Sequence, residues 1–158
     1  MNKRAFTLME LMIVIIIVGI LATVGLNQYS KQVEVGRTSE ARAIWGHLAK
    51  RVMEYYLNGG VLSSITNADI GVGTASTDIP SACRSTNYYS YTRSGSYSTN
   101  TMWLHAYRCT SGGKSPQGSP WYYIAAHVNA NSGIYGFACQ SAATSSTWVF
   151  TDKFTPCW

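Results

Sequence analysis

The sequence predicts an α+β fold, in which a long N-terminal α-helix packs against an antiparallel β-sheet. An apolar run near the N-terminus, residues 6–26, is long enough for a helix of several turns. Apolar residues then recur at steps of three and four as far as residue 57. From residue 88 onwards, short segments rich in aromatic and β-branched residues alternate with turn-forming residues. Helix and strand signals in separate parts of the chain are typical of this fold class.

The N-terminal run, from Phe6 to Leu26, is interrupted only by two threonines and by Glu10. As an α-helix it would be about 31 Å long, which is enough to cross the hydrocarbon core of a membrane. A secretory signal peptide is one alternative, although the run exceeds the usual signal core of about 7–15 residues and no small-x-small cleavage site follows it. A plain membrane anchor is another, but a carboxylate at the centre of a membrane helix costs about 2.5–3.5 kcal/mol. Glu10 therefore indicates a functional residue that needs a partner.

The basic residues and the apolar run after them resemble the class III signal of type IV pilins and of the related pseudopilins. The resemblance rests on the stretch KRAFTLMELMIV, from Lys3 to Val14, and extends through GILA to Tyr29. It implies that a prepilin peptidase cuts between Ala5 and Phe6, and that the new α-amino group of Phe6 is then N-methylated. The family usually has glycine before the cut, a position that Ala5 occupies here.

The resemblance also supplies a partner for Glu10. Glu10 lies one helical turn after Phe6 and could pair with the amine of its own chain. In the family model, this glutamate instead pairs with the N-terminal amine of a neighbouring subunit, here that of Phe6, inside the apolar core of a filament. An unpaired charge is costly there, so Glu10 is expected to set the register between subunits. Many relatives carry a helix-breaking proline two residues before the tyrosine. Asn27 takes that place here, close to Gly25, which leaves open whether the helix loosens at this point.

The helical pattern continues beyond the apolar run. The residues on its apolar face are Ala41, Ile44, Leu48, Val52 and Tyr55. The sequence Asn58-Gly59-Gly60 favours a helix end, because these residues tolerate left-handed backbone conformations. One helix from Phe6 to about Leu57 would be about 80 Å long. A simple linker is the alternative for its second part, which the apolar face disfavours. The predicted parts are a leader peptide (1–5), a transmembrane or filament-core helix (6–29), an amphipathic helix (30–58) and a head with two disulfides (59–158).

The head is expected to begin with an irregular connector, residues 59–87, which is rich in loop-forming residues. The predicted strands are Tyr88–Arg93, Thr101–Cys109, Trp121–Val128, Ile134–Gln140 and Thr147–Thr151. Short strands joined by turns favour antiparallel pairing. A hairpin loop is predicted at Gly95–Asn100, a tighter loop at Asn129–Ser132 and a longer one at Thr110–Pro120. The more apolar face of this sheet is expected to pack on the helix.

The head carries all the cysteines of the chain, which are Cys83, Cys109, Cys139 and Cys157. An even number of cysteines behind an export-like N-terminus predicts two disulfides, and the sequence alone leaves three pairings open. Zinc is the competing interpretation, but no two cysteines form the closely spaced pair that zinc sites usually have. Many pilins close a loop near the C-terminus with a disulfide, so the resemblance favours the pair Cys139–Cys157 together with Cys83–Cys109.

Other kinds of site have little support in the sequence. The 12 Lys+Arg and 7 Asp+Glu residues give a net charge of +5, which is not by itself a nucleic-acid signature. The histidines, His47, His105 and His127, lack metal-binding spacing, and no nucleophile and base can be paired for catalysis. The sequence thus predicts a protein that is not an enzyme and binds no metal or cofactor. Aromatic residues of the head could stack on sugars or bases, but sheet packing and filament contacts are favoured.

The resemblance implies a structural subunit of a type IV pilus that serves adhesion, twitching motility or DNA uptake. The subunit would span the inner membrane once, be processed by the prepilin peptidase and methyltransferase, and polymerise with copies of itself into extracellular filaments. An assembly ATPase and a platform protein are further implied partners, and the filament would be the part that meets DNA or surfaces.

Three alternatives stay open. The first is a type II secretion pseudopilin, a subunit of a short periplasmic pseudopilus. Many major pseudopilins bind calcium and lack disulfides, whereas this head has cysteines and only Asp69, Asp78 and Asp152 as carboxylates. The second is a minor pilin at a filament tip. The third is a singly anchored periplasmic binding protein, which would keep its leader or never polymerise.

Overall fold

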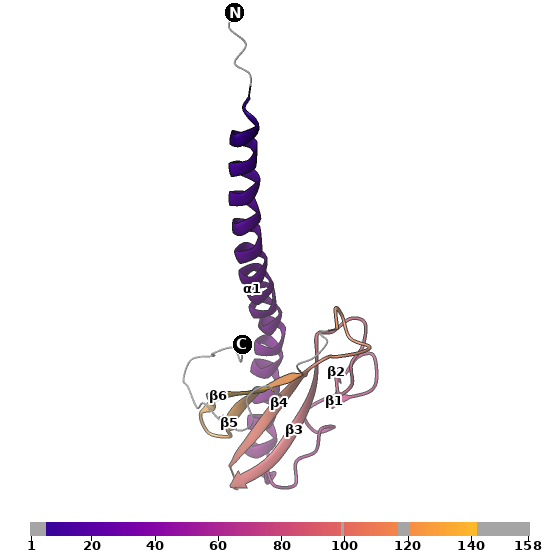
Figure 1. Ribbon diagram of the computed structural model, residues 1–158. Helices are drawn as coiled ribbons and strands as arrows, with labels where there is room; N and C mark the ends of the chain where they lie inside the picture. Colours follow the sequence, from indigo (N-terminus) through magenta and orange to yellow (C-terminus); the bar gives the residue numbers. More distant parts are fainter. Residues whose placement is uncertain (1–5, 99, 117–120, 142–158) are drawn as a thin grey trace, which may run out of the picture. The chain divides into compact units, whose positions relative to one another are not determined.

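The computed structural model of the chain describes residues 6–98, 100–116 and 121–141 (Figure 1). The chain divides into two compact units after Gly36. The first unit contains the first part of the long helix, and the second contains the rest of that helix and the strands.

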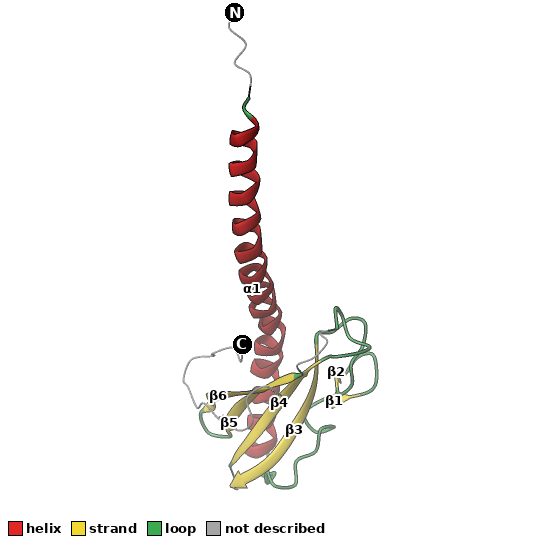
Figure 2. Cartoon of the chain, viewed as in Figure 1, coloured by secondary structure: helices red, strands yellow, loops and turns green. Residues whose placement is uncertain are grey.

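Helix α1, Leu8–Leu57, is a single uninterrupted helix of 50 residues (Figure 2). It confirms the predicted long N-terminal helix, although it begins at Leu8 rather than at Phe6. The helix continues past Gly25 and Asn27, where many relatives have a proline. Nothing lies within 4 Å of the position that a Cβ at Gly25 would occupy, so packing inside this unit does not require glycine there.

The end of α1 is set by the two glycines that follow Asn58. Gly59 has a φ of 85°, a left-handed conformation that glycine adopts without steric cost. Its N–H donates to the carbonyl of Tyr56 at 3.0 Å, and the N–H of Gly60 donates to the carbonyl of Tyr55 at 3.0 Å. This pair of bonds is a Schellman motif, which satisfies helix carbonyls that would otherwise lack a partner. The predicted helix end is therefore confirmed.

The larger sheet of the second unit has four strands and is antiparallel throughout, in the order β3-β4-β5-β6 (Figure 1). Its strands are β3 (Tyr89–Ser98), β4 (Thr101–Arg108), β5 (Tyr122–Asn129) and β6 (Gly133–Ser141). The predicted α+β architecture is confirmed, and four predicted strands correspond to these four. The fifth predicted strand, Thr147–Thr151, lies outside the described residues.

Two predictions about the head were wrong in detail. Strand β3 continues to Ser98 through much of the predicted loop Gly95–Asn100, because register shifts after Ser94 and Ser96 absorb the extra residues. The connector 59–87 is also not wholly irregular, because β1 (Val72–Gly73) pairs in parallel with β2 (Ile79–Pro80). Strands of two residues are too short to show an alternating pattern in a sequence.

One face of the sheet shares a hydrophobic core with the part of α1 that belongs to the second unit. The buried core residues of α1 are Ala41, Trp45, Leu48, Ala49 and Val52, and the strand residues include Tyr89, Tyr91, Met102, Leu104, Ala106, Tyr122, Ile124, Ala126 and Val128. Ile44 and Tyr55 are partly buried against this cluster. The predicted apolar face of the helix is therefore correct, and Trp45, fully buried, extends it. Each large apolar side chain buried here contributes about 1.5–3 kcal/mol to folding.

The other face of the sheet carries aromatic and histidine side chains at alternating positions of β4 and β5. His127 stacks on Trp103 at a centroid distance of 4.3 Å, and His105 lies 5.0 Å from the ring of Tyr123. His105 also has its Nδ1 within 3.2 Å of the Tyr107 hydroxyl. His105 is 8% exposed and His127 is 9% exposed. Burial lowers the pKa of His105 to about 4, and it also lowers the pKa of His127.

This histidine pair is expected to make the head sensitive to acid. Between pH 6.5 and about 4, the unfolded chain binds a proton at His105 that the folded chain does not, so stability falls as the pH falls through this range. Between pH 7.5 and 4.5 the loss from His105 should be about 2–3 kcal/mol, and His127 adds to it in the same direction. The measurement is urea unfolding of the detergent-solubilised full chain at both pH values.

The variant His105→Phe should show a smaller stability difference between pH 7.5 and 4.5 than the parent chain. Carboxylates that titrate in the same range contribute equally to both proteins, so the comparison isolates the histidine. His47→Gln is the matched control, because His47 is exposed on α1. An unchanged pH difference in His105→Phe would contradict this account.

Candidate assembly site

The first unit presents a continuous apolar surface. Every residue from Phe6 to Leu26 is exposed within the unit, and the large apolar side chains there are 47–77% exposed. The most apolar window of α1 has a mean hydropathy of 2.6, and none of it is buried. By length and composition the helix could therefore cross a membrane. An exposed apolar surface of this extent is unfavourable in water, so the helix needs lipid or other apolar helices around it.

A reciprocal pair of hydrogen bonds joins Glu10 to Thr7 at the start of this helix. The backbone N–H of Thr7 donates to Glu10 Oε2 at 3.0 Å, and the Thr7 hydroxyl donates to the same oxygen at 2.8 Å. In return, the backbone N–H of Glu10 lies 3.2 Å from the Thr7 hydroxyl oxygen. This arrangement is a capping box, with Thr7 as the N-cap residue. The carboxylate thus has a partner within its own chain.

Thr7 is a helix-capping residue that the sequence analysis missed. The spacing Thr7-Leu8-Met9-Glu10 matches the S/T-x-x-E signature of a capping box and could have indicated it. Phe6 precedes the N-cap and is 74% exposed, and Ala5 lies outside the described residues. The cap involves only atoms on the C-terminal side of the Ala5–Phe6 bond, so cleavage of that bond would leave it intact.

In the second unit, Glu40 fastens strand β3 to the helix. The backbone N–H of Tyr88 donates to both carboxylate oxygens of Glu40, at 3.1 and 3.3 Å, and the Tyr91 hydroxyl donates to Oε1 at 3.3 Å. Burial, together with the charge of Glu40, raises the pKa of Tyr91, so its hydroxyl stays protonated and keeps donating. The guanidinium of Arg37 lies 5.4 Å from the centre of the Tyr88 ring. These contacts fix the start of β3 against the part of α1 that belongs to the second unit.

A disulfide joins Cys83 to Cys109, with their Cα atoms 5.7 Å apart. It links the connector that follows α1 to the end of β4, and it is one of the two pairs that the sequence analysis favoured. The loop after β4 folds back over it, because the N–H of Lys114 donates to the carbonyl of Asn87 at 2.8 Å. The other favoured pair lies outside the described residues, because Cys157 does.

The described residues contain no cluster of histidine, cysteine, aspartate or glutamate side chains that could hold a metal ion. What the two units offer instead are surfaces: an apolar helix with one capped carboxylate, and a disulfide-linked head. Such surfaces are suited to association with other apolar or protein surfaces.

Comparisons with known proteins identify the family of this chain. A family model described as the prokaryotic N-terminal methylation motif matches residues 1–26. Fimbrial protein EcpC of Eikenella corrodens is 32% identical to this chain over 141 residues, which are 89% of the chain and 84% of the relative. The chain belongs to the type IV pilin superfamily.

Other relatives of this pilin match it over a shorter stretch. A fimbrial protein of Neisseria meningitidis serogroup A is 47% identical over 77 residues, which are 49% of this chain and 44% of the relative. Type IV major pilin protein PilE1 of Neisseria gonorrhoeae is 43% identical over 77 residues, which are 49% of this chain and 35% of the relative. This pilin thus matches less than half the length of these two relatives. No solved structure is significantly similar to it.

Proposed function

We propose that this pilin is a structural subunit of a type IV pilus, which polymerises through its N-terminal helix into surface filaments. The observation that carries the proposal is the exposed apolar surface of the first unit, in a chain whose relatives are named fimbrial proteins and major pilins. Burial of this surface against the same surface of neighbouring copies would drive assembly. The filament would serve adhesion, twitching motility or DNA uptake, and the chain would have no enzymatic activity. No observation favours the pseudopilin alternative.

The path to the filament would begin in the inner membrane, which the apolar helix 6–29 would span once. The leader 1–5 would be removed at the Ala5–Phe6 bond by the prepilin peptidase, and Phe6 would then be N-methylated. An assembly ATPase and a platform protein would move the subunit from the membrane into the filament. The amphipathic helix 30–58 and the head 59–158 would then lie outside the filament core.

Within the filament core, Glu10 would set the register between subunits. Its carboxylate would meet the Phe6 amine of a neighbouring copy, while the Thr7 cap holds the side chain at the helix start. A copy docked out of register would bury a charge without its partner, which is strongly unfavourable.

The test is to shear filaments from cells that produce this chain and to analyse the sheared fraction by immunoblotting and electron microscopy. We expect long fibres in which this chain, starting at Phe6, is the main protein. A chain that is found only in membranes would argue against a major pilin. Peptide mass analysis of the same fibres reports both leader cleavage and N-methylation.

A further inference from the structure

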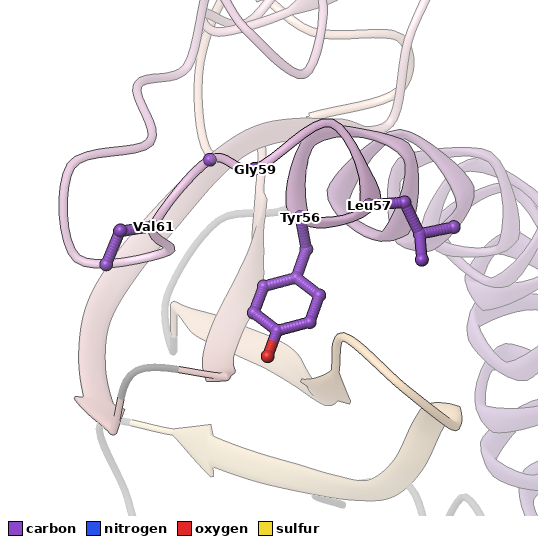
Figure 3. Close-up of a pocket in the computed structure, with 5 residues that line it drawn as sticks. Tyr56, Leu57, Gly59 and Val61 are labelled. Carbon is purple, nitrogen blue, oxygen red and sulfur yellow. The ribbon is translucent and has the colours of Figure 1, made fainter.

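The second unit has an apolar hollow where α1 ends. It has a volume of about 540 Å³ and is lined by Tyr56, Leu57, Gly59, Gly60 and Val61. Tyr56 and Leu57 project from the last turn of α1, and Val61 comes from the segment that follows (Figure 3). Leu57 is 77% exposed and Val61 is 47% exposed, so apolar atoms of the hollow face the solvent.

A second apolar feature, formed by aromatic side chains, lies where β5 begins. Trp121, which precedes β5, is 48% exposed. Its ring stacks parallel to that of Tyr123, with an interplanar angle of 9° and a centroid distance of 6.3 Å. Tyr107 of β4, 37% exposed, also packs on Tyr123, with the two ring centroids 5.1 Å apart. Packing on Tyr123 supports Trp121 at the surface, where a large rigid side chain is suited to fill a pocket of a partner.

These two features lie at opposite ends of the second unit. Trp121 lies at the start of β5, a strand of eight residues that is about 27 Å long. At its other end, the turn after Asn129 leads to Gly133, where an added Cβ would lie 3.9 Å from the Sδ atom of Met53. Met53 is less than one helical turn before Tyr56, so the hollow is close to the far end of β5.

We infer that the hollow of one copy receives Trp121 of the next copy in the filament. This inference rests on the proposed function. A contact between different surfaces at opposite ends of a molecule is heterologous, and repeating it produces an open chain of subunits rather than a closed dimer. The occupant that this inference assigns to the hollow is a second copy of this chain.

The charges at the two ends complement each other. The last turn of α1 carries the exposed Glu54 and no basic residue, so the negative end of the helix dipole is not compensated there. Lys50 and Arg51 lie one turn earlier, and the Arg51 guanidinium lies beside Gly71. At the opposite end, the exposed Lys114 projects over the ring of Tyr88 at 5.0 Å. Trp121 thus shares its end of the unit with an exposed cation, which would approach the negative helix end.

The small area that this contact would bury explains why it would form only between subunits already assembled in a filament. One tryptophan side chain buries about 150–250 Å². A stable interface between two free proteins buries at least about 1,000 Å². The contact is therefore too small to join free heads, and it orients heads that the assembled helices already hold together.

The experiment is cysteine cross-linking in sheared filaments of the full chain. The double variant Leu57→Cys/Trp121→Cys, treated with a mild oxidant, should give a ladder of covalent oligomers on a non-reducing gel. The matched control His47→Cys/Trp121→Cys, whose first site is exposed on α1 away from the hollow, should give no ladder. Dimers from Leu57→Cys alone would instead show a symmetric contact and would overturn the inference.

The remaining outcomes separate this inference from the proposed function. Fibres of the double variant without cross-links would overturn the inference and leave the function intact, whereas a parent chain that makes no fibres would overturn the function. As a second measurement, Trp121→Ala should lower the amount of fibre that survives vortexing several-fold, and Trp121→Phe should retain most of it. Fibres of Trp121→Ala as resistant as those of the parent would also overturn the inference.

Discussion

Replacement of Glu10 by valine is expected to abolish the filaments and to leave the processed subunit in the membrane. In the proposed filament, each Phe6 amine is buried among apolar helices, and without Glu10 it would have no counter-charge there. Breaking a buried pair by removing one partner costs about 3–5 kcal/mol. The cost recurs at every subunit added, so growth of the filament should stop. The measurement is the ratio of this chain in sheared fibres to that in membranes, by immunoblotting.

The capping box makes it possible to separate the charge of Glu10 from its local role. Glu10→Gln keeps an oxygen that can accept the hydrogen bonds of Thr7 and removes the charge. Thr7→Val keeps the charge and removes the hydroxyl, which should cost the helix start about 0.5–2 kcal/mol. If the charge sets the register, Glu10→Gln should fail like Glu10→Val, and Thr7→Val should still assemble. Normal filaments from Glu10→Val would show that the register role is wrong.

The long helix and the antiparallel strands of the sheet could be predicted because both depend on local patterns. The spacing of Ala41, Leu48 and Val52 repeats the period of an α-helix, and all three are buried in the core. Likewise, Met102 and Leu104 alternate with Trp103, and the two sets face opposite sides of the sheet. Patterns of this kind hold wherever one face of an element is buried.

The head contacts of Glu40 could not be predicted, because they depend on tertiary packing. Its role as an acceptor for Tyr88 and Tyr91 joins residues that are 48 and 51 positions apart in the sequence. Helical spacing alone would pair Glu40 with a neighbour on the helix, such as Arg37. When a carboxylate accepts hydrogen bonds from a backbone far away in the sequence, the residues next to it in the chain show no pattern that would predict the contact.

Of the assembly surfaces, one could be predicted from the sequence and the other could not. The apolar run and Glu10 form a contiguous motif, so sequence alone could find them. Trp121 and the hollow around Leu57 come from separate elements at the two ends of the second unit, and only the folded chain shows that Trp121 is exposed. The sequence analysis placed Trp121 as the first residue of a predicted strand and favoured sheet packing and filament contacts for the aromatic residues of the head, without separating the two for this side chain.

Loss of the disulfide between Cys83 and Cys109 is expected to lower the free energy of unfolding of the head by about 3–4 kcal/mol. The bond closes a loop with a sequence separation of 26 residues, and in the chain-entropy model a loop of this length contributes about 3.5 kcal/mol. The double variant Cys83→Ala/Cys109→Ala is preferred to serine, because Cys109 is fully buried and a hydroxyl there would need a partner. Urea unfolding of the detergent-solubilised full chain measures the difference.

The loss of stability in the double variant should exceed that from removing one ordinary side-chain contact, because the disulfide also supports the loop after β4. In that loop Gly113 packs so closely that an added Cβ would lie 2.8 Å from the sulfur of Cys109. Arg108 holds the same loop independently, since its Nη2 donates to the carbonyl of Ser115 at 2.7 Å. The double variant should therefore keep the native circular dichroism spectrum in buffer and differ mainly in its unfolding midpoint. A midpoint equal to that of the parent would mean that the connector is held in place without the disulfide.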